Sequence, residues 1–101
     1  MIRIHREPYR LTVTGHATDG KTFSPVCAAV SALVYTLAAL VADLAAEARV
    51  TDVLWDLKPG DACIACRPKS GEKDRVAQGF HTVCRGFELL CTQFPDQVQY
   101  Q

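Results

Sequence analysis

A long stretch without charge, residues 25–42, constrains the fold of this chain more than any other feature of its sequence. It is built mostly from alanine, valine and leucine. Ser24 followed by Pro25 is the strongest helix-start signal in the chain, because serine caps helix N-termini and proline fits the first helical position. Asp43 and Glu47 continue the same helix in polar form. The sequence therefore predicts one long helix that begins at Pro25.

The apolar character of this helix leaves two interpretations open. Its length lies near the lower limit for a membrane span, so a membrane-associated helix is the alternative, which detergent dependence on purification would reveal. However, much of the stretch is alanine, and no aromatic or basic belt flanks it. A helix that is apolar nearly all round is more often the buried helix of a soluble domain or dimer. We therefore expect no membrane contact, with one side of the helix on a sheet and another against a second copy.

The remaining segments have the patterns of strands and of one further helix. Residues 74–93 carry apolar side chains at three-four spacing, which predicts an amphipathic helix, and residues 97–100 are a possible final strand. Trp55 is interpreted as a core aromatic on its strand. Four short apolar or alternating segments predict two hairpins: residues 1–4 with 11–14, and residues 50–57 with 61–66 across a Lys-Pro-Gly turn at 58–60.

The order of these elements is strand, strand, helix, strand, strand, helix and a possible final strand. This order predicts an α+β fold, with two helices packed on one face of a small, largely antiparallel sheet. A chain of 101 residues has room for a single core, so residues 1–101 are expected to form one domain. Its 49% hydrophobic residues are enough for a compact core.

Charge and the N-terminal sequence narrow the classes of function. Eleven basic residues balance eleven acidic ones, so no net field favours a phosphate backbone, and we expect no nucleic-acid partner. The N-terminal residues are charged without an apolar segment behind them, which argues against a signal peptide and favours a cytoplasmic location.

Five cysteines are present, an odd number that cannot pair completely within one molecule. Cys63 and Cys66 have the spacing of half a zinc site, but Cys84 and Cys91 lie seven residues apart on a predicted helix and do not complete it. Residues three apart on a strand also point to opposite faces. We therefore predict reduced thiols that serve packing, with no metal and no redox pair.

Cys27 falls in the first turn of the long predicted helix. The unpaired N–H groups and the positive end of the helix dipole favour a thiolate over a thiol at this position. Cys27 is therefore a candidate nucleophile, and the alternative is a small buried hydrophobe among its apolar neighbours. Backbone N–H groups of this turn, that of Ala28 in particular, are candidate donors to an oxyanion.

His16 follows Gly15 where the second predicted strand ends. A cysteine protease needs a base within hydrogen-bonding reach of its sulfur, first to take the thiol proton and later to protonate the leaving amine. A strand end beside a helix start could bring His16 to Cys27 for this purpose. Taken alone, His16 is more often a turn residue than a catalyst.

Two motifs resemble a known family. Gly-His-Ala at 15–17 and Val-Cys-Ala-Ala-Val-Ser-Ala-Leu at 26–33 are similar to the signature of the bacterial ribosomal-processing cysteine proteases. The resemblance extends along the whole chain and implies a small, cytosolic, homodimeric thiol endopeptidase that needs no cofactor. Members of that family remove an N-terminal extension from large-subunit ribosomal protein twenty-seven in Firmicutes and relatives.

The resemblance also assigns roles to residues. It implies that His16 is the catalytic histidine, that Cys27 is the nucleophile, and that Ser31, one helical turn later on the same face, supports the site. The loop at residues 18–23 is expected to order over the substrate. Its candidate substrate contacts are Asp19, Gly20 and Phe23.

The chain departs from the family pattern just before Cys27. Ser24 stands where the family has an aspartate, Pro25 replaces an isoleucine, and the loop between His16 and Cys27 is one residue shorter. Ser24 can cap the helix but supplies no carboxylate. Two alternatives follow: a processing protease for a non-ribosomal substrate, for example from a phage, or a catalytically weak paralogue that acts as a protein-binding module.

Overall fold

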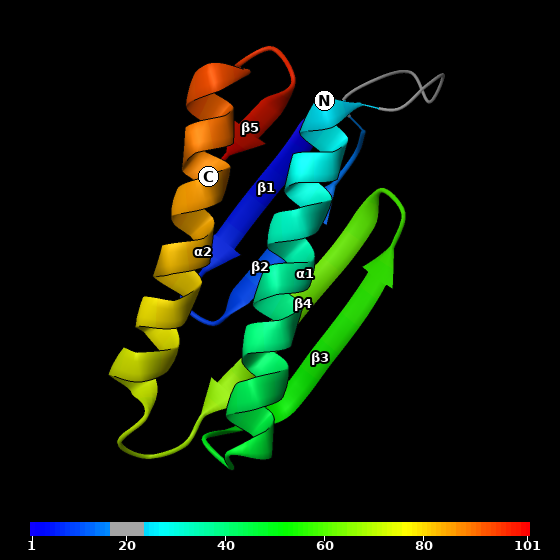
Figure 1. Ribbon diagram of the computed structural model, residues 1–101. Coiled ribbons are helices and arrows are strands. Elements are labelled where there is room, and N and C mark those ends of the chain that lie inside the picture. The colour runs from blue at the N-terminus through cyan, green and yellow to red at the C-terminus, as the bar shows by residue number, and fades with distance from the viewer. Residues whose placement is uncertain (17–23) are drawn as a thin grey trace.

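Five strands and two helices make up the part of the chain that the structure describes, residues 1–16 and 24–101 of a computed structural model (Figure 1). Their positions agree with the predicted elements to within a few residues. The strands are β1 (Ile2–Glu7), β2 (Arg10–Thr14), β3 (Val50–Lys58), β4 (Asp61–Pro68) and β5 (Val98–Tyr100), and the helices are α1 (Pro25–Ala46) and α2 (Lys73–Gln93).

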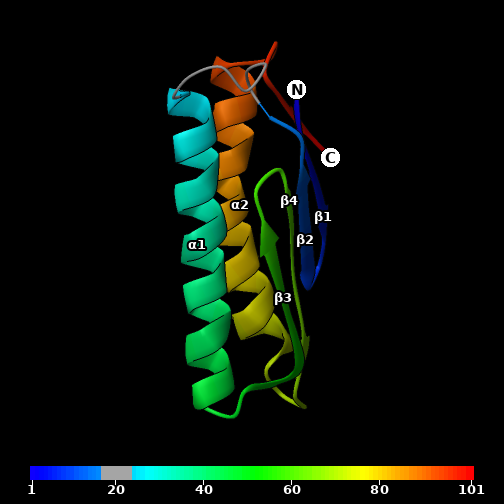
Figure 2. The same cartoon turned by 90° about the vertical axis from the view of Figure 1, so that its right-hand side faces the viewer.

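The strands form one sheet in the order β3-β4-β2-β1-β5. Neighbouring strands are antiparallel except β1 and β5, which pair in parallel. Figure 2 shows the sheet nearly edge-on, with both helices on the same side of it. The two predicted hairpins are therefore joined through β2 and β4, and the predicted α+β fold is confirmed.

The core lies between the helices and the sheet face that they cover. In β1 and β2 the buried side chains alternate with exposed or half-buried ones, because successive strand residues point to opposite faces. In α1 the buried residues recur every three or four positions and form one stripe. The members of this stripe are Val26, Val30, Val34, Leu37, Val41 and Leu44.

The start of α1 is built as the sequence predicts. Ser24 has an extended backbone, and its side-chain oxygen accepts a hydrogen bond of 3.2 Å from the N–H of Cys27. Pro25 occupies the first turn, where its missing N–H costs nothing. The position of Cys27 in the first helical turn is thereby confirmed.

The outer side of α1 remains open in the described structure. Its most apolar stretch has a mean hydropathy of 2.1, yet only 28% of that stretch is buried. By length and composition alone α1 could cross a membrane, which is weak evidence because core helices of soluble proteins satisfy the same test. The expectation of no membrane contact stays a prediction.

Trp55 is not a core residue, and the interpretation of it as one is wrong. It pairs with Ile64 and so points to the side of the helices, yet it is 48% exposed. The reason is its place on β3, the edge strand. Figure 1 shows β3 running obliquely to α1 and away from it toward the β3–β4 turn. The alternation identified the correct side of the sheet, but neither α1 nor α2 covers that side at Trp55.

Candidate active site

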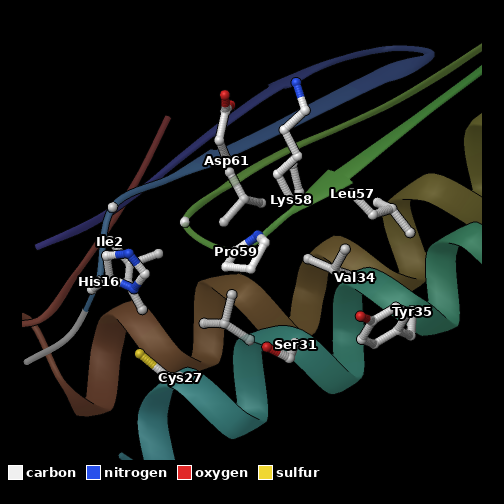
Figure 3. A pocket seen from close by; sticks show the side chains of 15 residues that line it. Ile2, His16, Cys27, Ser31, Val34, Tyr35, Leu57, Lys58, Pro59 and Asp61 are labelled. Atoms are coloured by element: carbon white, nitrogen blue, oxygen red, sulfur yellow. The ribbon is translucent and has the colours of Figure 1, made fainter. Parts of the chain in front are cut away.

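A pocket of about 290 Å³ lies between the first turns of α1 and the β3–β4 turn (Figure 3). One wall comes from α1, where Cys27, Ser31 and Tyr35 follow one another at four-residue spacing. The opposite wall comes from the end of β2 and from the β3–β4 turn, with His16 and Gly60 among its residues. The divergence of β3 from α1 leaves this space between them.

A side-chain hydrogen bond holds the backbone at Cys27, whose side chain lines the pocket. Its N–H is held by the Ser24 side chain, which is itself buried. The Cys27 side chain is half-buried at the pocket. The first turn of α1 therefore presents the Cys27 side chain to the pocket, where its sulfur can act as a nucleophile.

His16 enters the same pocket from the end of β2. The preceding residue, Gly15, has a φ of +92° and donates its N–H to the carbonyl of Gly60 over 2.9 Å. A Cβ at Gly15 would lie 2.1 Å from the backbone oxygen of Met1, so only glycine fits where the chain bends toward the pocket. The structure therefore brings His16 and Cys27, eleven residues apart in sequence, to one pocket.

The remaining site predictions have different outcomes. Ser31 is exposed and lines the same pocket one turn beyond Cys27. The N–H of Ala28 donates to the carbonyl of Ser24 over 3.0 Å, so an oxyanion there would have to compete with that carbonyl. The predicted substrate contacts Asp19, Gly20 and Phe23 lie outside the described residues.

Sequence reasoning missed part of the pocket. Tyr35 is two helical turns beyond Cys27, and its four-residue spacing from Ser31 could have identified it. Leu57 and Gly60 belong to a hairpin whose turn was recognised, but its place beside Cys27 depends on strand pairing that the sequence does not specify. The missed residues give the pocket an apolar end, formed by Tyr35 and Leu57, beyond the Cys27 and His16 end.

The other four cysteines lie away from this pocket. Cys66 is buried on the core side of β4, whereas Cys63 points to the opposite face, where Arg10 donates a 3.4 Å hydrogen bond to its sulfur. The predicted opposite orientation of this pair is confirmed. Within residues 1–16 and 24–101, no group of three or more His, Cys, Asp or Glu residues is arranged to hold a metal ion.

Burial controls the chemistry of the core thiols. It raises the pKa of Cys66 and of Cys84 above the ordinary thiol value. At Cys84 the charge of Arg6 and a hydrogen bond with Tyr100 act weakly in the other direction. Both groups are therefore neutral packing thiols.

Comparison with known proteins gives a family match over nearly the whole chain. The family model described as cysteine protease Prp matches residues 1–99. No curated protein matches the chain.

Solved structures also share the fold. SMU.848 from Streptococcus mutans is 26% identical, with a TM-score of 0.66 over 99% of this chain and 90% of that one. The essential ribosomal processing protease Prp from S. aureus, in complex with a covalently linked product peptide, has a TM-score of 0.73 at 17% identity, over 100% of this chain and 98% of that one. The same S. aureus protein with a substrate peptide has a TM-score of 0.66 at 14% identity, over 99% and 95%.

Proposed function

Because the chain belongs to the cysteine protease Prp family, we propose that Cys27 and His16 are the catalytic dyad of a cysteine endopeptidase. The observation that carries this proposal is that both side chains line one pocket, although they come from separate elements (Figure 3). A half-buried thiol at a helix start and an exposed imidazole at a strand end are the nucleophile and the base that peptide hydrolysis by a thiol requires.

In the proposed mechanism, His16 takes the thiol proton and the sulfur of Cys27 attacks the scissile carbonyl. Collapse of the tetrahedral intermediate forms a thioester and breaks the peptide C–N bond, while His16 returns the proton to the leaving amine. His16 then takes a proton from water, whose oxygen attacks the thioester. The carboxylic acid leaves and the thiol is restored.

Ser31 and the first turn of α1 are proposed to support this reaction. Ser31 lies one turn from Cys27 and can hold the site in shape through its hydroxyl. N–H groups of residues 26–28 point out of the helix at its N-terminus and are the proposed oxyanion donors. Of these, the Cys27 N–H also donates to the Ser24 side chain and the Ala28 N–H to the Ser24 carbonyl. No cofactor takes part in these steps.

The proposed substrate is a short N-terminal extension of a protein, in the first place large-subunit ribosomal protein twenty-seven. Support comes from family membership and from the S. aureus ribosomal processing protease of the same fold, solved with peptides. Ser24, in place of the family's aspartate, is the observation that favours a non-ribosomal substrate as the second candidate.

We further propose that the enzyme is a cytoplasmic homodimer. The outer side of α1 supports this assembly, because it exposes small apolar residues and Tyr35, which is 63% exposed. Light scattering at micromolar concentration should give twice the mass of 11.1 kDa. A monomer would contradict the dimer and leave the dyad proposal intact.

Cleavage of a synthetic peptide that spans the ribosomal extension tests the dyad. Cys27→Ala and His16→Ala should each lower kcat/KM by at least about a thousandfold, as loss of a nucleophile or its base does. Cys63→Ala, on the far face of the sheet, is the matched control and should cleave normally. Full cleavage by Cys27→Ala would refute the mechanism. Peptide binding without cleavage by the unmodified protein would instead favour the binding module.

A further inference from the structure

The β3–β4 turn, residues 59 and 60, contacts the proposed base directly. A Cβ built on Gly60 would lie 2.4 Å from Nε2 of His16 and 2.8 Å from its Cε1. Real Cβ atoms essentially never approach another heavy atom within 3.0 Å. The imidazole of His16 therefore occupies the space that any side chain at position 60 would need.

The same glycine also fixes the backbone that leads to His16. Its carbonyl accepts the N–H of Gly15 over 2.9 Å, and the neighbouring residues Thr14 and Asp61 are paired across β2 and β4. The turn thus controls both the main chain before His16 and one edge of its ring. Gly60 itself has a φ of +72°, which glycine adopts without strain.

We propose that Gly60 is a positioning residue for His16. This inference rests on the proposed dyad and goes beyond it, because Gly60 carries no side chain that could react. Ordinary contact begins at about 3.4 Å, so a methyl group at position 60 displaces the imidazole edge by about 1 Å. A misplacement of that size in a catalytic group costs about a hundredfold in rate.

Gly71 provides a matched control for this substitution. It has a φ of +82°, and a Cβ built on it meets nothing within 4 Å. Gly60→Ala and Gly71→Ala therefore both place alanine at an unfavourable positive φ, but only the former displaces His16. Gly60→Asn and Gly71→Asn form a second pair, because asparagine tolerates positive φ and still carries a Cβ.

The test measures alkylation of Cys27 by iodoacetamide from pH 5 to 9, read by mass spectrometry, with the partly exposed Cys63 and Cys91 as internal references. This small reagent reports on the thiolate without requiring substrate to bind. His16→Ala should slow alkylation of Cys27 by about tenfold or more, because no base then takes the thiol proton. Gly60→Ala and Gly60→Asn should do the same, while both Gly71 variants keep the profile of the unmodified protein.

Peptide cleavage provides the second readout. The Gly60 variants should lose about a hundredfold in kcat with a smaller change in KM, and the Gly71 variants should lose neither. If His16→Ala changes the profile but the Gly60 variants match their Gly71 counterparts, the positioning role is refuted and the dyad stands. If His16→Ala leaves the profile unchanged, the dyad itself is refuted.

Discussion

α1 and α2 lie side by side on the same face of the sheet (Figures 1 and 2), but they use their apolar residues differently. In α2 the apolar residues are concentrated on the buried face, where Phe80 and Phe87 fill the centre of the core. In α1 apolar residues also cover the outer side, which residues 1–16 and 24–101 leave open, and the first turns line the pocket. Packing accounts for most of the apolar residues of α2, where Leu89 is the large one that is exposed, but for only one side of α1.

The two helices also contribute different residues to the contact between them. Leucines of α1 lie over glycines of α2, and a Cβ at Gly79 or Gly86 would come within 2.6 or 2.7 Å of Leu40 or Leu33. α2 thus supplies the small residues that let α1 approach. The comparison shows that α2 serves mainly to fill the core. α1 also packs on the core, but its N-terminus and its outer side remain available for other functions.

The largest expected difference between the helices is in stability. Phe80→Ala should lower the free energy of unfolding by about 3–5 kcal/mol, because it leaves a cavity in the core. Tyr35→Ala, the aromatic substitution on the open side of α1, should change the free energy of unfolding of the monomer by only about 0.5 kcal/mol. Urea titrations followed by circular dichroism measure both. Equal losses would show that the outer side of α1 is also part of the core.

A smaller effect is expected at the start of α1. Ser24→Ala removes the oxygen that accepts the Cys27 N–H, and loss of such a cap costs about 1 kcal/mol. The same substitution at Ser70, an exposed residue before α2, is the control and should cost little. Thermal denaturation compares the two. Should both variants melt alike, the cap contributes nothing to α1.

The smallest effect concerns the buried thiol of α2. Burial raises the pKa of Cys84 above its ordinary value of 9.0, so above that pH the unfolded chain releases this proton more readily than the folded one. The stability it contributes is complete below pH 9 and is lost as the pH rises toward the folded pKa. Between pH 8 and pH 10 the free energy of unfolding should therefore fall less in Cys84→Ala than in the unmodified chain. If the free energy of unfolding fell equally in both proteins, Cys84 would be excluded as the source of this pH dependence.

The parts of the fold that could be predicted from the sequence are those specified by residues close together in the chain. Ser24 and Pro25 specify where α1 begins, and the three-four spacing of residues 74–93 specifies the buried face of α2, because capping and periodicity act between residues close in sequence. The same locality explains the failure at Trp55. Alternation gives the side of the sheet, but whether a helix covers that side depends on the angle between elements distant in sequence.

For the candidate site, the sequence by itself determined that Cys27 stands at a helix start and that His16 ends a strand after a glycine. Only the tertiary structure decided that Gly60 lies against the His16 ring and that Tyr35 and Leu57 close the far end of the pocket. The reason is physical: these contacts arise from the pairing of β2 with β4 and from the divergence of β3 from α1. Such contacts join segments that no local pattern relates.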